Sequence, residues 1–214
     1  MHSGVYPRLG TDESGKGDYF GYLVTAGVVL QDPQDEERLR ELGVMDSKRI
    51  TDKRALALAE EICRFLPHEI VEMSPAKYNE LYPAFGNLNK LLAWMHARVI
   101  ESLLTRCSCL LVVVDQFADE AVLRQSLMQK GKQVKVTQRT QAEADLAVAA
   151  ASIVARARFL TNLEKLSELA GVKLPKGAVS VIEPAKEVVA RRGQDFLTQV
   201  AKLHFRVTQA VLEG

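Results

Sequence analysis

The sequence predicts an α/β protein with a mixed sheet flanked by helices and a helical C-terminal extension. Two observations carry this prediction. Short β-branched or continuously apolar runs alternate along the chain with segments whose apolar residues recur every three or four positions, which is typical of strands separated by helices. The first two apolar runs are joined by a glycine-rich turn, which predicts a hairpin before the helices begin.

The first half of the chain contains the predicted hairpin, one helix and a brief strand. The first strand ends near Asp12, and the second covers residues 19–30. We expect a helix from an N-cap at Thr51 to about residue 66, because Pro67 stops it. A strand over residues 70–73 follows, ended by Ser74-Pro75.

The second half repeats the alternation of helix and strand. Apolar side chains spaced by three and four predict an amphipathic helix over residues 87–104. The continuous apolar run at 109–114 predicts a central strand that is buried on both faces. The remaining expected elements are a helix at 120–130, a strand at 133–137, an alanine-rich helix at 144–166, and helices at 186–191 and 195–212.

Length and composition limit the class of protein. The chain has 214 residues and 47% hydrophobic content, enough for one domain over residues 1–214 with a helical part from about residue 167. Its 28 basic and 27 acidic residues leave a net charge of +1, so any site for a polyanion must be local. The three cysteines form no spaced CxxC pair, which favours reduced thiols.

No apolar stretch reaches the ~20 residues that a membrane span needs, and the first residues do not resemble a signal peptide. We therefore expect a soluble, cytoplasmic protein that does not contact membranes. No obligate protein partner is indicated, and we expect a monomer.

Two adjacent acids near the start of the chain are the most informative feature. Asp12 and Glu13 are followed at once by Ser14 and by the loop Gly15-Lys16-Gly17. Carboxylate oxygens are the ligands that Mg²⁺ prefers, and glycines let the backbone approach a ligand closely. The stretch predicts a place where a divalent cation and a phosphodiester meet.

Other acids are predicted at the same edge of the sheet. Asp115 follows the apolar run at 110–114, where a charge is costly unless something pairs with it. Ligands of open α/β sheets bind at the carboxyl ends of strands. A fourth acid is available where the alanine-rich helix begins, at Glu143 or Asp145. Either could instead only stabilise the helix dipole, by ~0.3–1 kcal/mol.

The neighbouring acids pose a geometric problem. Consecutive residues on a strand point to opposite faces. Asp12 and Glu13 therefore reach one metal site only if the chain twists or bulges there. The turn at Ser14-Gly15 makes such a distortion our expectation.

Eight motifs, in order from residue 10 to about 206, closely resemble those of the type 2 ribonucleases H, and of ribonuclease HIII in particular. Lysine between the two loop glycines favours the HIII branch, because the HII branch carries arginine there. The motifs are GTDESGKGDYFG at 10–21, DSK at 46–48, YN at 78–79, NLN at 87–89, VDQF at 114–117, AVAAASIVAR at 147–156, LPKGA at 174–178 and AKLHF at 201–205.

The resemblance implies a ribonuclease-H-like fold and metal-dependent cleavage of the RNA strand of RNA/DNA hybrids, leaving 5′-phosphate and 3′-hydroxyl ends. It makes Asp12, Glu13 and Asp115 ligands of Mg²⁺ or Mn²⁺, two ions per site. It favours Glu143 as the fourth catalytic acid and leaves Asp145 open.

The same resemblance implies that residues 14–17 contact the backbone of the hybrid and sense the ribose 2′-hydroxyl. Lys48 is the next candidate for a phosphate contact, whereas His96 and His204 lie in apolar helical patterns and are interpreted as structural. The chain departs from the family in starting directly at the catalytic part, without the N-terminal substrate-binding domain that is common in ribonuclease HIII.

Two other functions stay open on the sequence alone. Residues 10–16 match the spacing G-x-x-x-x-G-K of a phosphate-binding loop, although Gly17 replaces the required Ser or Thr and two acids would repel a triphosphate. The chain could also be a hybrid-binding module without catalytic activity.

Overall fold

The computed structural model describes residues 4–44, 50–140 and 142–213. Of Glu143 it describes the backbone but not the side chain. The chain divides into two compact units. The first contains residues 1–14, 25–71 and 87–157, and the second contains residues 15–24, 72–86 and 158–214. Each unit is therefore assembled from stretches that are far apart in the sequence.

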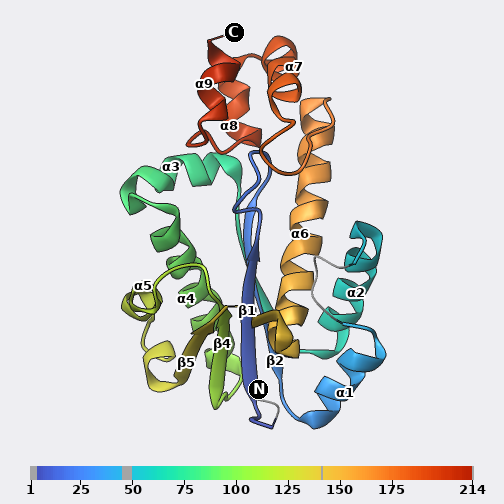
Figure 1. Ribbon diagram of the computed structural model, residues 1–214, viewed down its shortest axis with the longest axis vertical. Coiled ribbons are helices and arrows are strands. Elements are labelled where there is room, and N and C mark those ends of the chain that lie inside the picture. The colour runs from blue at the N-terminus through green and yellow to red at the C-terminus, as the bar shows by residue number, and fades with distance from the viewer. Residues whose placement is uncertain (1–3, 45–49, 141, 214) are drawn as a thin grey trace. The chain divides into compact units, whose positions relative to one another are not determined.

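The strands form a five-stranded sheet in the order β3-β2-β1-β4-β5. β1 pairs in parallel with β4, and β4 in parallel with β5. In Figure 1, β1 runs between α4 (Leu88–Arg106) on one side and α6 (Leu146–Ala170) on the other. The strands are β1 (Arg8–Ser14), β2 (Leu23–Leu30), β3 (His68–Met73), β4 (Leu111–Asp115) and β5 (Lys135–Arg139).

Burial explains the central strands. All eight residues of β2 are buried, as are the first four of β4, so both strands are continuously apolar rather than alternating. Val112 and Val114 of β4 pack with Val99 and Leu103 of α4 in the main core of the first unit. The predicted central strand and its helical cover are thus confirmed.

Nine α-helices and three 3₁₀ turns occur in the described residues (Figure 1). The α-helices are α1 (Pro33–Glu41), α2 (Asp52–Phe65), α3 (Pro75–Phe85), α4 (Leu88–Arg106), α5 (Glu120–Ser126), α6 (Leu146–Ala170), α7 (Ile182–Arg192), α8 (Leu197–Val200) and α9 (Val207–Leu212). The 3₁₀ turns are η2 (Gly131–Gln133), η3 (Ala142–Ala144) and η4 (Gln194–Phe196).

Capping side chains set the starts of several helices. Thr51 accepts a hydrogen bond from the Arg54 amide and begins α2, as the sequence predicts. Asn87 accepts one from the Lys90 amide and begins α4. The expected strand end at Ser74-Pro75 is also the start of α3, because Ser74 caps that helix and proline is tolerated in its first turn.

Several predicted boundaries are wrong. β2 begins at Leu23 rather than at residue 19, and the helix predicted to reach residue 130 ends at Ser126. The helix expected over 195–212 is broken into η4, α8 and α9, because the chain turns at Ala201 to form a β-bridge with Phe20.

α6 packs closely on β1 through small residues. A Cβ atom on Gly10 would lie 2.2 Å from the backbone carbon of Ala147, so no residue larger than glycine fits there without movement. Ala149, Ala150 and Ala151 are fully buried. The alanine-rich start of α6 therefore lies directly against the strand that carries Asp12.

α6 is also long and apolar enough to cross a membrane by length and composition alone, which corrects the expectation from the sequence. It has 25 residues and a mean hydropathy of 1.3 in its most apolar window, but 67% of that window is buried inside the protein. The core helix of a soluble protein passes the same test, so this is weak evidence for a membrane span.

Candidate functional site

The register of the parallel strands brings two of the predicted acids together. Thr11 of β1 pairs with Val114 of β4, so Asp12 and Asp115 follow at the same level at the carboxyl ends of adjacent strands. The Oδ1 atom of Asp115 accepts a hydrogen bond of 3.1 Å from the Ala142 amide. This bond holds the start of η3 beside the two strand ends.

Asp12 lies where negative charge is concentrated. Burial raises the pKa of Asp12 well above its usual range, and the charges of Glu13 and Asp115 raise it further. The Ser152 hydroxyl and the Glu13 amide, at 2.7 Å from Oδ1, donate hydrogen bonds that offset part of this effect. A bound cation would relieve the same repulsion, so the donors and the local charge fit a divalent metal.

Glu13 is held by a histidine of α4. His96 Nε2 lies 3.1 Å from Glu13 Oε2, and both side chains are nearly inaccessible, at 0% and 2% exposure. His96 Nδ1 lies 2.9 Å from the Thr11 hydroxyl. Because a carboxylate only accepts hydrogen bonds, Nε2 donates to Glu13. In the neutral ring, Nδ1 then accepts from Thr11.

An aromatic contact completes this arrangement. The Phe117 ring stacks on His96, with centroids 4.8 Å apart and planes inclined by 8°. Phe117 comes two residues after Asp115, so His96 connects the segment that follows β4 with Glu13 of β1. The sequence interpretation missed this role, although a histidine among the apolar positions of a helix was a usable signal.

The expected distortion of β1 is not what the structure shows. Glu13 points to His96 on α4, whereas Asp12 bonds Ser152 on α6, as the alternating pleat of a strand dictates. Within residues 4–44, 50–140 and 142–213, no three His, Cys, Asp or Glu side chains lie close enough together to hold a metal ion. Asp12 and Asp115 are neighbours by register, and Glu13 faces elsewhere.

The two candidates for the fourth acid differ. Both carboxylate oxygens of Asp145 lie 3.1 Å from Nε of Arg8, a buried arginine, and Oδ1 also accepts from the Ala147 amide. Asp145 is therefore occupied in capping α6 and pairing with Arg8, whose guanidinium also pairs with Glu36 at 2.5 Å. The backbone of Glu143 lies in η3, next to the Ala142 amide that bonds Asp115.

The predicted substrate loop follows β1 and belongs to the second unit. Gly15 has φ +94°, and a Cβ atom there would lie 2.1 Å from the Tyr22 carbonyl oxygen, so glycine is required. Lys16 and Gly17 are exposed. Ser14 ends β1, and Lys48 lies outside the described residues.

Contacts within the second unit hold the segment that carries this loop. Asp18 Oδ1 accepts from the Gly177 amide at 2.6 Å, and the Tyr19 amide donates to the Gly177 carbonyl at 2.9 Å. Two hydrogen bonds therefore hold together the motifs around Asp18 and Gly177, which are 159 residues apart in the chain.

A buried lysine supports the same segment. Lys202 is fully buried, and its ammonium group donates to the carbonyl oxygens of Gly21 at 2.7 Å and Phe20 at 3.4 Å. Burial lowers the pKa of Lys202 to about 7, and the charge of Asp18 opposes that effect. Sequence reasoning did not predict that Lys202 is buried.

His204, interpreted from the sequence as structural, packs against two tyrosine rings. It is exposed, and its ring lies 4.5 Å from the ring centroid of Tyr82 and 5.2 Å from that of Tyr78. Burial and the charge of Lys202 lower the pKa of His204. It lies in the second unit, as do Tyr78 and Tyr82.

The alternative of a nucleotide-binding loop is excluded by the fold. In such sites the glycine-rich loop opens a helix. Here residues 10–14 belong to β1, and the next element along the chain is the strand β2. Gly10 serves the packing of α6 on β1 instead.

Comparison with known proteins supplies independent evidence. The family model for ribonuclease HII matches residues 9–208. Ribonuclease HIII of Protochlamydia amoebophila is 49% identical over 96% of this chain and 68% of the relative's own length. Ribonuclease HIII of Chlamydia abortus is 44% identical over 100% of this chain and 72% of its own length.

Solved structures of ribonucleases HIII also resemble this chain. The crystal structure of Bst-RNase HIII in complex with Mn²⁺ matches with a TM-score of 0.91 and 31% identity, over 99% of this chain and 71% of that one. RNase H3 of Aquifex aeolicus gives a TM-score of 0.77 and 33% identity, over 94% of this chain and 72% of that one.

Proposed function

Because this chain belongs to the ribonuclease HII family and is a type 2 ribonuclease H most similar to ribonuclease HIII, we propose that it cleaves the RNA strand of RNA/DNA hybrids by a two-metal mechanism. The products carry 5′-phosphate and 3′-hydroxyl ends. The observation that supports this most is the parallel register that sets Asp12 beside Asp115, where burial and neighbouring carboxylates raise the pKa of Asp12.

Asp12 and Asp115 are the residues that would hold Mg²⁺ or Mn²⁺, whereas Glu13, the third ligand expected from the sequence, is bonded to His96 on the other face of β1. A divalent cation bound there supplies activation of the attacking water and stabilisation of the leaving 3′-oxygen. The relative whose structure contains Mn²⁺ supports a divalent cofactor. The Thr11 hydroxyl bonds Nδ1 of His96 and orients its ring, and Nε2 of His96 in turn orients the Glu13 carboxylate.

Glu143 is our choice for the fourth acid. Asp145 already pairs with buried Arg8 and caps α6, so its carboxylate is committed to the fold. Glu143 follows directly after the residue whose amide bonds Asp115. Its position in the backbone favours it for a contact with the substrate or the metal.

Substrate recognition is assigned to Ser14 and the loop Gly15-Lys16-Gly17, with Lys48 as a second phosphate contact. The exposed Lys16 suits a phosphate, and the glycines allow the backbone to approach the ribose 2′-hydroxyl. We further propose that the enzyme acts as a cytoplasmic monomer.

The test is a cleavage assay on an RNA/DNA hybrid, a duplex with one embedded ribonucleotide, and double-stranded RNA, each with Mg²⁺, Mn²⁺ or chelator. We expect metal-dependent cleavage of the hybrid and no cleavage of double-stranded RNA. Binding of the hybrid without metal-dependent cleavage would instead support a non-catalytic hybrid-binding module.

A further inference from the structure

A strongly basic segment forms one edge of the first unit. Residues 121–142 contain five basic residues and no Asp or Glu, in a chain whose net charge is only +1. All five are exposed and come from α5, the following turn and β5. We call them the basic edge: Arg124, Lys130, Lys132, Lys135 and Arg139.

Nearby acids leave most of this charge uncompensated. Glu120 pairs with Arg124 at 2.6 Å. Glu101 instead accepts hydrogen bonds of 3.0 Å from the backbone amides of Lys130 and Gly131. In the part of the chain that the structure describes, the ammonium groups of Lys130, Lys132 and Lys135 form no ion pair.

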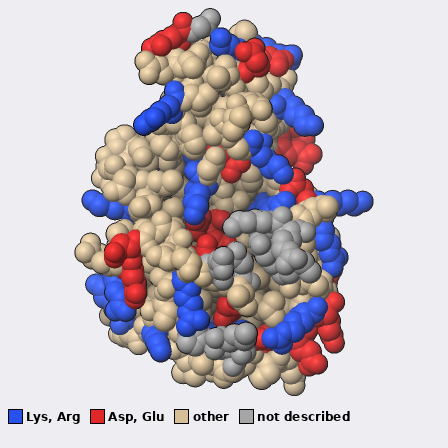
Figure 2. All heavy atoms as spheres, viewed as in Figure 1, with Lys and Arg blue, Asp and Glu red and all other residues tan. Residues whose placement is uncertain are grey.

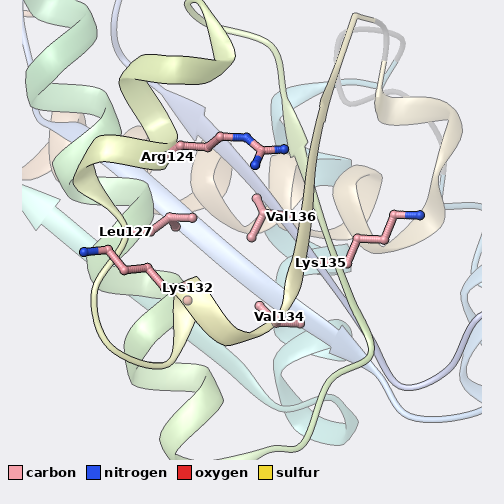
Figure 3. Close-up of a pocket in the computed structure, with 7 residues that line it drawn as sticks. Arg124, Leu127, Lys132, Val134, Lys135 and Val136 are labelled. Carbon is pink, nitrogen blue, oxygen red and sulfur yellow. The ribbon is translucent and has the colours of Figure 1, made fainter.

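The side chains spread over a surface rather than converge. A pocket of about 370 Å³ has an apolar floor that includes Leu127 and Val136. In Figure 3, the Arg124 guanidinium lies near Val136, while the ends of Lys132 and Lys135 point to opposite sides. One small anion could not reach both ammonium groups, whereas a polymer with repeated charges could.

Figure 2 shows the same distribution on the molecular surface, where Lys and Arg side chains gather over α5 and β5 at the lower left. This surface belongs to the same unit as Asp12 and Asp115. A polyanion bound at the carboxylates can therefore extend over it without any assumption about the second unit.

The register of β5 gives the distance between Lys135 and the carboxylates at the ends of β1 and β4. Arg139 pairs with Asp115 of β4, and Lys135 lies four residues earlier on the same strand. At about 3.3 Å per residue this places Lys135 about 13 Å from the carboxylate edge. For a duplex that runs along β5 with the phosphate spacing of B-DNA, about 3.4 Å along the axis, this distance corresponds to about four base pairs.

We propose that the basic edge binds backbone phosphates of the hybrid about four base pairs from the cleaved linkage. The proposal rests on the proposed function, and it assigns to this surface a sequence-independent contact that extends the footprint beyond the active site. Phosphate contacts position a duplex without reading its sequence.

The test compares a double variant, Lys132→Gln with Lys135→Gln, against a matched control, Lys53→Gln with Lys90→Gln. The control lysines are exposed and belong to the same unit. Binding of a labelled 20-base-pair hybrid is measured by fluorescence anisotropy in chelator from 50 to 200 mM salt, where no cleavage interferes. Circular dichroism checks that both variants fold.

Two lost phosphate contacts should reduce the slope of log affinity against log salt by about 1.8. Between 50 and 200 mM salt, the affinity of the wild type should therefore fall about twelvefold more than that of the double variant. The control should keep the wild-type slope. On a hybrid that extends fewer than about four base pairs to either side of the cleaved linkage, the double variant and the wild type should have equal slopes.

If the double variant keeps the wild-type slope of log affinity against log salt, while the wild type binds and cleaves the hybrid, the proposal that the basic edge binds the hybrid is wrong. The proposed function is then unaffected. An equal loss of slope in the control also contradicts the proposal, because the slope would then depend on the net charge of the protein and not on the position of the lysines. Unchanged hybrid binding with loss of binding to poly-glutamate would assign the surface to an acidic protein partner instead. A wild type that neither binds nor cleaves the hybrid would contradict the proposed function itself.

Discussion

Replacing Lys202 with Met should change how the stability of the protein depends on pH. Lys202 is fully buried, and burial lowers its pKa from 10.5 to about 7. In the unfolded chain the ammonium group keeps its proton up to about pH 10.4. Between these values the unfolded state binds more protons, so the free energy of unfolding rises with pH.

The size of the effect follows from the two pKa values. At 1.36 kcal/mol per unit, keeping Lys202 charged in the fold costs about 5 kcal/mol. That cost is fully present below pH 7 and disappears as the pH approaches 10.4. From pH 7 to pH 9, this group alone should add about 2 kcal/mol to the free energy of unfolding.

The assay is urea unfolding followed by circular dichroism, in chelator, at pH 7, 8 and 9, for the wild type and Lys202→Met. Groups that titrate in both proteins cancel in the difference between them. The advantage of the wild type over the variant should grow by about 2 kcal/mol across this range. Lys165→Met, at an exposed lysine of the same unit, gives the slope that an exposed lysine contributes. A difference that stays flat or shrinks with pH refutes the account of Lys202.

Four other variants test the packing and the site. Gly10→Ala should lower the free energy of unfolding by about 3 kcal/mol, since the new Cβ would lie 2.2 Å from the α6 backbone; a wild-type melting curve would contradict that close approach. His96→Gln should slow hybrid cleavage about 10–100-fold by releasing Glu13, measured as single-turnover rate with folding checked by circular dichroism, and an unchanged rate would remove His96 from the mechanism. Glu143→Gln should slow cleavage about 100-fold or more, whereas Asp145→Asn should mainly lower stability, by about 1–3 kcal/mol, because it weakens the pairing of buried Arg8; the reverse pattern would make Asp145 the catalytic acid.

Local signals in the sequence predicted the elements that carry the site. The cap at Thr51, the apolar spacing over residues 87–104 and the apolar run before Asp115 are all signals between residues close in the sequence, so propensity and pattern suffice to find them. The missed helix α3 shows the limit of such signals. Ser74-Pro75 ends a strand and starts a helix with the same two residues, and only the following packing decides what comes next.

The features that sequence reasoning missed are contacts between distant residues. The pairing of Glu13 with His96 joins residues 83 positions apart, and that of Gly21 with Lys202 joins residues 181 apart. Nothing near Lys202 in the sequence distinguishes it from an exposed lysine. For Asp12 and Glu13, the ordinary pleat of a strand was the better guide, since the structure keeps their side chains on opposite faces.

The central claim is that Asp12 and its neighbour Asp115 form the metal-dependent catalytic centre of a ribonuclease H. The most direct measurement is the single-turnover rate of hybrid cleavage across a Mn²⁺ titration, for the wild type and for Asp12→Asn. We expect the wild-type rate to rise with Mn²⁺ and saturate, and the folded variant to stay at least about 100-fold slower at every concentration. A variant that cleaves at the wild-type rate would contradict the claim.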